Sequence, residues 1–127
     1  MRKLIVVFAL LYGVYWYASS RFNFANTLVY AHNNQQAKWA PAAEYYIGLV
    51  YYQRAEYPKA QEAFTQLLTD FSTGPYTARG LRRLASSAEE NRDFGIARQS
   101  LTRFIEEFPD DKERRAAEAR LDMIKFK

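Results

Sequence analysis

The chain of 127 residues contains no cysteine, five scattered glycines and a single histidine, His32. The absence of cysteine excludes disulfide frameworks, thiolate metal sites and cysteine nucleophiles, although it leaves the redox compartment open. The glycines form no glycine-rich phosphate loop. At this length the upper limit is one compact domain with appendages, which excludes an enzyme with separate cofactor and substrate lobes.

Few side chains are candidates for catalysis or for metal binding. His32 lies in the segment AHNNQQ, which reads most simply as the polar end of a helix. A small hydrolase that uses His32 is one alternative function, and unchanged activity of a His32→Ala variant would dismiss it. Acidic pairs such as Glu106-Glu107 point about 100° apart on a helix and fit solvated faces better than a metal site. We therefore expect no catalytic residue, metal, cofactor or small-molecule substrate.

The chain also lacks a large excess of charge of one sign. The chain has 18 Lys and Arg against 14 Asp and Glu, a net charge of +4. Basic residues alternate with acidic ones instead of forming a single stripe, so we expect no nucleic-acid partner.

An uncharged apolar run follows Arg2 and Lys3. It covers residues 4–18 and reads LIVVFALLYGVYWYA. With the next two serines it spans roughly 25 Å, a little less than a bilayer core of about 30 Å, and aromatic rings at the interface could complete the span. The run predicts a single transmembrane anchor over residues 1–21. The residues expected to hold it in the membrane are Leu4, Val7, Phe8, Leu11, Tyr12, Tyr15 and Trp16.

A cleaved secretory signal and a buried soluble helix remain alternatives for this segment. Aromatic residues beside the small residues at 18–20 disfavour cleavage. Basic charge before the run slightly exceeds that after it, so the positive-inside rule places the amino terminus in the cytoplasm and the rest of the chain in a periplasm. This predicts an inner-membrane protein whose partners include the lipid bilayer and integral membrane proteins.

The remaining chain contains an internal repeat of 37 residues. Sliding the chain by this number aligns large residues with large ones and small with small: Ile47 with Leu84, Gly48 with Ala85, Tyr57 with Phe94, Ala60 with Ala97, and Phe64 with Leu101. Apolar residues recur at steps of three or four, which is typical of helices. The turns at residues 53–56 and 91–93 are so short that the two helices of each repeat must be antiparallel neighbours.

Residues 43–64 and 81–109 resemble tetratricopeptide repeats. The matching residues are Ile47-Gly48, Tyr51, Tyr57, Ala60 and Phe64 in the first, and Leu81, Leu84-Ala85, Phe94, Ala97, Leu101 and Pro109 in the second. The spacing of 37 is similar to that of longer-helix repeat proteins of the Gram-negative envelope. The resemblance implies an all-α fold, a helical-hairpin solenoid of two and a half repeats over residues 41–127.

Such a short solenoid needs a cover over its first repeat, because a helix pair buries its apolar face only against neighbours. A helical face formed by Phe22, Phe24, Ala25, Leu28 and Val29 could supply it. We expect a packing helix over about residues 22–37, within a connecting segment 22–40. It would be continuous with the membrane helix or kinked near Ser19-Ser20.

The resemblance also implies that the first helices of successive repeats line a concave surface. Its expected members are Tyr45, Tyr46, Leu49, Tyr52 and Gln53 from one helix and Arg79, Arg82, Arg83, Ser86 and Glu90 from the next. Arginine forks suit carboxylates and tyrosines offer rigid contact area, so the surface could clamp an acidic segment. Alternatively, the tyrosines pack on the helix at residues 22–37, and the arginines pair with Glu44, Glu89 and Glu90.

These observations together indicate a non-catalytic, membrane-anchored scaffold for protein–protein interactions, an accessory subunit of a larger membrane protein complex. The alternative is an envelope assembly or chaperone-like factor that holds client segments in the groove.

Overall fold

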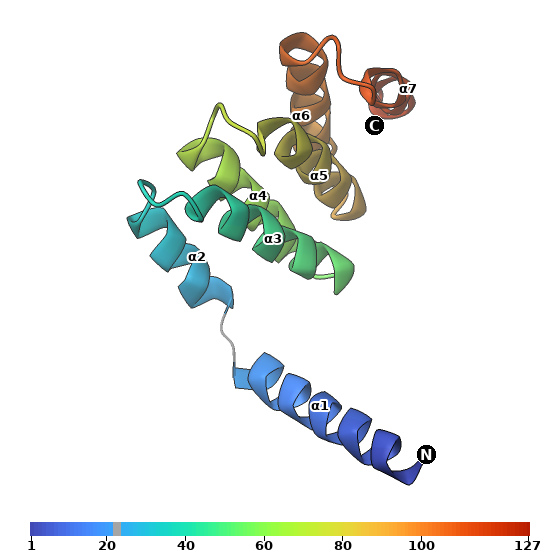
Figure 1. Ribbon diagram of the computed structural model, residues 1–127. Coiled ribbons are helices and arrows are strands. Elements are labelled where there is room, and N and C mark those ends of the chain that lie inside the picture. Colours follow the sequence, from blue (N-terminus) through green and yellow to red (C-terminus); the bar gives the residue numbers. More distant parts are fainter. Residues whose placement is uncertain (22–23) are drawn as a thin grey trace.

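The computed structural model describes the chain apart from residues 22–23 and the side chains of residues 19–21. The described part is all-α, and its seven helices follow one another in the order shown in Figure 1. They are α1 (Arg2–Arg21), α2 (Phe24–Asn33), α3 (Ala40–Gln53), α4 (Tyr57–Asp70), α5 (Thr77–Glu90), α6 (Phe94–Glu107) and α7 (Arg114–Ile124).

Helix boundaries from α2 onward repeat every 37 residues. Helices end at Asn33, Asp70 and Glu107, and the helices that follow begin at Ala40, Thr77 and Arg114. Therefore α3–α4 and α5–α6 are complete helix pairs, α2 has the position of a second helix, and α7 has the position of a first helix. The predicted helical-repeat solenoid is confirmed.

The sequence explains where these helices begin and turn. Pro41 and Pro58 lie in the first turns of α3 and α4, where the missing backbone N–H removes no helical hydrogen bond. The tight turn inside each pair contains one residue with a left-handed backbone, Ala55 at φ 60° and Arg92 at φ 58°. Both turns reverse the chain within three residues, so the paired helices are antiparallel neighbours as predicted.

Helix α2 packs against the first helix pair. Phe24 meets the ring of Tyr51 edge-on, with 5.7 Å between centroids, and Leu28 packs against the same core. The helix is shorter than predicted, because it ends at Asn33 and turns occupy the residues before α3. The predicted contribution of Phe22 lies outside the described residues, and α1 runs through Ser19-Ser20 to Arg21.

The predicted transmembrane helix is wrong. Among the helices of the described residues, none has both the length and the apolar character that crossing a bilayer requires. In α1 the side chains without a polar atom form an unbroken run only over residues 4–11, which is about 12 Å of helix. Beyond it, polar-tipped rings and serines lower the hydropathy. The inner-membrane localisation and its cytoplasmic–periplasmic orientation, which rested on that helix, are contradicted with it.

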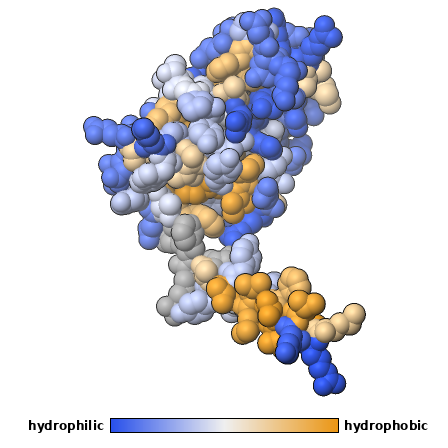
Figure 2. Space-filling view, in the orientation of Figure 1, coloured by the Kyte–Doolittle hydropathy of each residue, from blue (hydrophilic) through white to orange (hydrophobic). Residues whose placement is uncertain are grey.

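Helix α1 extends away from the repeat domain in Figure 1, and its apolar residues form the large hydrophobic region in the lower part of Figure 2. The residues predicted to anchor it are all exposed, from Val7 at 50% to Tyr12 at 70%. The repeat domain, by contrast, buries several large side chains completely, Phe64 and Phe104 among them.

Candidate functional site

The predicted binding residues lie on α3 and α5, the first helices of the two complete repeats, and α7 occupies the equivalent place in the next repeat. Tyr46, Arg83 and Arg120 are separated by 37 residues each, and all three side chains are exposed. We call the surface formed by Tyr46, Tyr76, Arg79, Arg82, Arg83, Ser86 and Arg120 the first-helix surface. Its aromatic side chains come from α3 and the residue before α5, and its arginines come from α5 and α7.

The aromatic end of this surface is a chain of ring contacts. Tyr46 is 50% exposed and meets Tyr45 edge-on at 5.2 Å and Tyr76 at 6.2 Å. The guanidinium of Arg79 lies over the Tyr76 ring at 5.3 Å. Tyr45 itself is buried and packs against Phe64 and Tyr76. Of the predicted tyrosines, Tyr46 is therefore the exposed one, and Tyr76 connects it to Arg79.

The other predicted groove residues lie in different environments. Leu49 is half-buried and packs against the core. Tyr52 contacts Tyr57 of α4, with 5.5 Å between ring centroids. Gln53 and Glu90 are exposed and end their helices. These four side chains belong to the predicted groove in sequence, but the contacts found in the described residues do not join them to the arginines.

The basic end is a pocket of about 230 Å³ between α5 and α7, which we call the arginine pocket. It is lined by Arg82, Arg83, Ser86, Leu101, Glu113, Ala116, Ala117 and Arg120. The Arg82 guanidinium lies over the ring of Phe104 at 5.8 Å, and its buried Nε has no hydrogen-bond partner. Arg120 pairs with Glu89 across the pocket edge. The pocket therefore holds cationic groups whose hydrogen-bonding capacity is only partly used.

In the alternative interpretation, the tyrosines pack on the helix at residues 22–37 and the arginines pair with nearby glutamates. The contacts of the structure differ from it. Tyr51, not Tyr45 or Tyr46, contacts α2 through Phe24. Within the described part of the chain, neither Arg82 nor Arg83 forms an ion pair.

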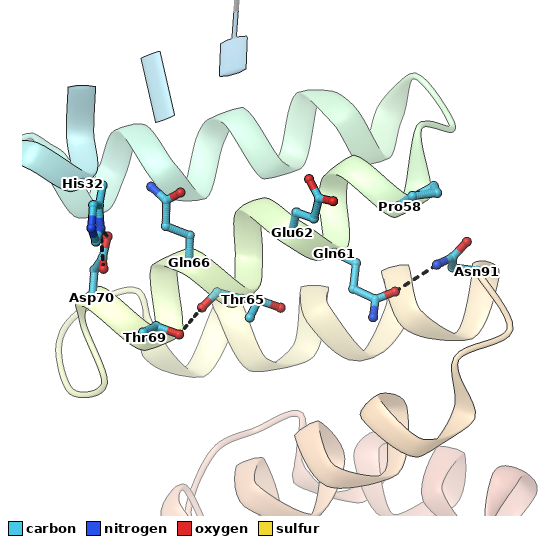
Figure 3. A pocket seen from close by; sticks show the side chains of 9 residues that line it. All are labelled: His32, Pro58, Gln61, Glu62, Thr65, Gln66, Thr69, Asp70 and Asn91. Atoms are coloured by element: carbon cyan, nitrogen blue, oxygen red, sulfur yellow. Dashed lines mark hydrogen bonds and ion pairs between the residues drawn. The ribbon is translucent and has the colours of Figure 1, made fainter. Parts of the chain in front are cut away.

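A second cluster was not predicted, and it joins three helices around Asp70. His32 Nδ1 of α2 lies 2.9 Å from Asp70 Oδ1 of α4, whose side chain is only 3% exposed (Figure 3). Gln66 donates to Glu44 Oε1 of α3 at 2.8 Å and approaches the Leu28 carbonyl at 2.8 Å. Burial, together with the nearby carboxyl of Asp70, raises the pKa of Glu44 to about 8. We call His32, Asp70, Gln66 and Glu44 the capping cluster.

Beside this cluster, an open groove of about 570 Å³ runs along α4 (Figure 3). Five of its nine lining residues are uncharged polar residues, and Gln61 accepts a hydrogen bond from Asn91 at 3.1 Å. Gln35, not a serine or threonine hydroxyl, is the other side chain near His32 Nδ1, at 3.3 Å. The described residues contain no group of three or more histidine or acidic side chains that could hold a metal ion.

Sequence reasoning placed neither Arg120 nor Asp70 in a site, and it considered Glu44 only as a partner of the arginines. The repeat register contained the signal for Arg120, because it lies 37 residues after Arg83. Asp70 and His32 are 38 residues apart, and no local pattern links them. The signal for Glu44 was a single acid between alanines and tyrosines on an otherwise apolar helix face.

Comparison with known proteins identifies one family. Its sequence model, described as Tetratricopeptide repeat, matches residues 42–73 and 80–111, which together are half of the chain. The two matches contain the helix pairs α3–α4 and α5–α6 almost completely. No curated protein matches the chain.

Proposed function

Because the chain belongs to the tetratricopeptide repeat family, whose stacked helix pairs bind protein partners, we propose that it is a non-catalytic scaffold that binds an acidic segment of a partner along the first-helix surface. The segment lies across α3, α5 and α7, with its apolar side chains on Tyr46 and its carboxylates in the arginine pocket. The family alone does not specify this function, because one repeat architecture serves many partners.

The arginine pocket is the observation that carries the proposal. A buried donor without a partner is unfavourable by about 1–3 kcal/mol, and Arg82 Nε is such a donor. A carboxylate from a partner in this pocket could pair with the guanidinium of Arg82 and with the exposed fork of Arg83. Arginine recognises carboxylates through two parallel N–H donors, so these residues favour an acidic ligand over a neutral one.

Tyr46 supports the second half of the proposal. It is a large ring held by edge contacts to two other tyrosines, so little conformational entropy is lost when a partner packs on it. Its position is equivalent to those of Arg83 and Arg120, so one extended segment can pass over all three.

We further propose that the scaffold is an accessory subunit of a larger assembly. The support is α1, whose large apolar side chains are exposed from Leu4 to Tyr17. Contiguous apolar area of this kind marks interaction sites, because single chains rarely keep it in water. The membrane proteins expected among the partners, and the resemblance to envelope proteins, stay predictions.

Site-specific photo-cross-linking in cells tests the surface. A photoreactive phenylalanine analogue at Tyr46 should cross-link a partner, and the same analogue at Lys112, on the connection between α6 and α7, should not. A peptide from the cross-linked partner is then measured by fluorescence anisotropy. We expect Arg82→Glu with Arg83→Glu to weaken its binding at least tenfold and Lys112→Glu to leave it within twofold.

Undiminished binding by the double variant would overturn the proposed site. Circular dichroism of the double variant establishes that it is folded. Stoichiometric co-purification of the partner after gentle extraction supports the accessory-subunit role, whereas substoichiometric, salt-sensitive capture would contradict it in favour of a chaperone-like holder of client segments.

A further inference from the structure

The capping cluster lies where α2 joins the repeat domain. His32 is the last charged or titratable side chain of α2, and it reaches across to Asp70 at the end of α4. Gln66 lies one turn earlier on α4 and contacts both the Leu28 carbonyl and Glu44. Polar contacts therefore connect α2 to α3 and α4 at two successive levels.

The capping cluster contains two carboxyl groups, of Glu44 and Asp70, and one basic side chain, His32. The titratable groups that face one another across the contact are His32 from α2, Glu44 from α3 and Asp70 from α4; Gln35 and Gln66 complete the described contacts as neutral amides. Glu44 is 0% exposed, and its Oε2 is buried without a hydrogen-bond partner. A charge on that oxygen would be uncompensated beside a second carboxylate, which is strongly unfavourable.

We propose that the capping cluster is a proton-dependent latch that holds α2 on the first repeat while Glu44 is neutral and weakens as Glu44 loses its proton. In the docked state α2 and Gln66 keep Glu44 from water. Release of α2 opens that side to solvent, where the carboxylate is hydrated and stable. Release of α2 therefore favours loss of the proton, and a rising pH favours release.

The direction of the pH dependence follows from the linkage between proton binding and the release of α2. Glu44 holds its proton up to about pH 8 when α2 is docked, and a solvated glutamate loses it near pH 4.3. Between these two values the docked state binds more protons than the released state, so the equilibrium constant for release rises with pH, by at most about tenfold per unit. Above about pH 8 the docked form also ionises, and the dependence levels off.

Hydrogen exchange of the full chain measures this release directly. We expect protection factors of amides in α2, corrected for intrinsic exchange, to fall more than tenfold between pH 5.5 and 8. In Glu44→Gln, which keeps the amide contact but cannot ionise, they should change less than threefold. Glu62→Gln, an exposed acid on α4, should behave like the unmodified chain.

Tryptophan fluorescence offers a second measurement of the release of α2. Trp39, immediately before α3, stacks on Tyr30 of α2 with 5.5 Å between ring centroids and an angle of 9°. In a Trp16→Phe background, Trp39 emission should follow the same pH dependence and lose it in Glu44→Gln. Protection factors in α2 that are no lower than those in α6 at pH 8 would overturn the latch, because they would show that α2 is released only by global unfolding. So would a pH dependence of α2 protection that persists in Glu44→Gln.

Discussion

Gly48 of α3 lies directly against the ring of Phe64 of α4, and a Cβ at Gly48 would come within 2.7 Å of the ring atom Cε1. Phe64 is completely buried, so its ring has no room to retreat. The same pair of positions in the next repeat is filled by Ala85 and Leu101, a larger residue against a smaller one. The distance between the helices of a pair is thus set by the combined size of these two side chains.

Gly48→Ala should therefore destabilise the domain although alanine favours helix. Overpacking is unfavourable by about 1–3 kcal/mol, against a propensity gain of about 1 kcal/mol. Urea unfolding followed by circular dichroism measures the difference. Gly95→Ala in α6 is the matched control, because its Cβ would lie 3.8 Å from the nearest atom, and we expect it to be neutral or stabilising. A Gly48→Ala variant as stable as the Gly95→Ala variant would contradict the packing argument.

Glu44 should make the stability of the whole domain depend on pH. Its pKa is about 8 in the folded protein, against 4.5 for the unperturbed group, mainly because burial disfavours the charged form. The folded state therefore binds more protons between these values, and the free energy of unfolding should fall as pH rises from about 4.5 to about 8 and then level off. Unfolding midpoints in urea across this range measure the effect.

Glu44→Gln is expected to remove most of that slope and to be more stable than the unmodified chain at pH 8. Glu62→Gln, on the exposed side of α4, serves as the control and should retain the slope. A slope that is unchanged in Glu44→Gln would assign the pH dependence to another group.

The sequence predicted the helix pairs well because their determinants are local or periodic. Prolines in the first turns, short reversals and a 37-residue repeat of large and small residues all fix the same register. The 37-residue repeat also predicts Arg120 as a surface residue equivalent to Arg83. The repeat does not predict the contacts of Asp70 and Glu44, because their partners come from helices distant in sequence.

The prediction for α1 was wrong for a different reason. The run at residues 4–18 contains no charge, and aromatic rings at the bilayer interface were expected to complete a span that is a little shorter than a bilayer core. Hydropathy instead depends on each side chain, and Tyr12, Tyr15 and Tyr17 each add a hydroxyl to the second half of the run. Those rings were interpreted as interfacial anchors, although they shorten the strongly apolar part of the helix.

The two left-handed residues in the turns predict a simple stabilisation. Ala55 at φ 60° and Arg92 at φ 58° occupy equivalent turn positions, and this backbone is unfavourable by about 1 kcal/mol for residues with a Cβ. Ala55→Gly and Arg92→Gly should each raise the free energy of unfolding by up to about 1 kcal/mol. Ala116→Gly, at an exposed position of α7, should lower it by a similar amount. A loss of stability in both turn variants would contradict this account.

The starts of α4 and α6 differ in one respect that suggests a gain-of-stability variant. Asp93 precedes α6, and its Oδ1 accepts a hydrogen bond from the Ile96 N–H at 3.3 Å, whereas Glu56 at the equivalent place before α4 makes no such bond. The two residues have similar backbone angles, φ −91° and ψ 74° against φ −90° and ψ 66°. Since the shorter aspartate is the better cap, Glu56→Asp should raise the free energy of unfolding by about 0.5–1 kcal/mol, and Asp93→Ala should lower it by about 1 kcal/mol. Urea unfolding of both variants measures the two effects, and Glu56→Ala as the control should be nearly neutral because it removes no cap. If Glu56→Asp is no more stable than Glu56→Ala, the side-chain bond to the backbone does not account for the difference between the two helix starts.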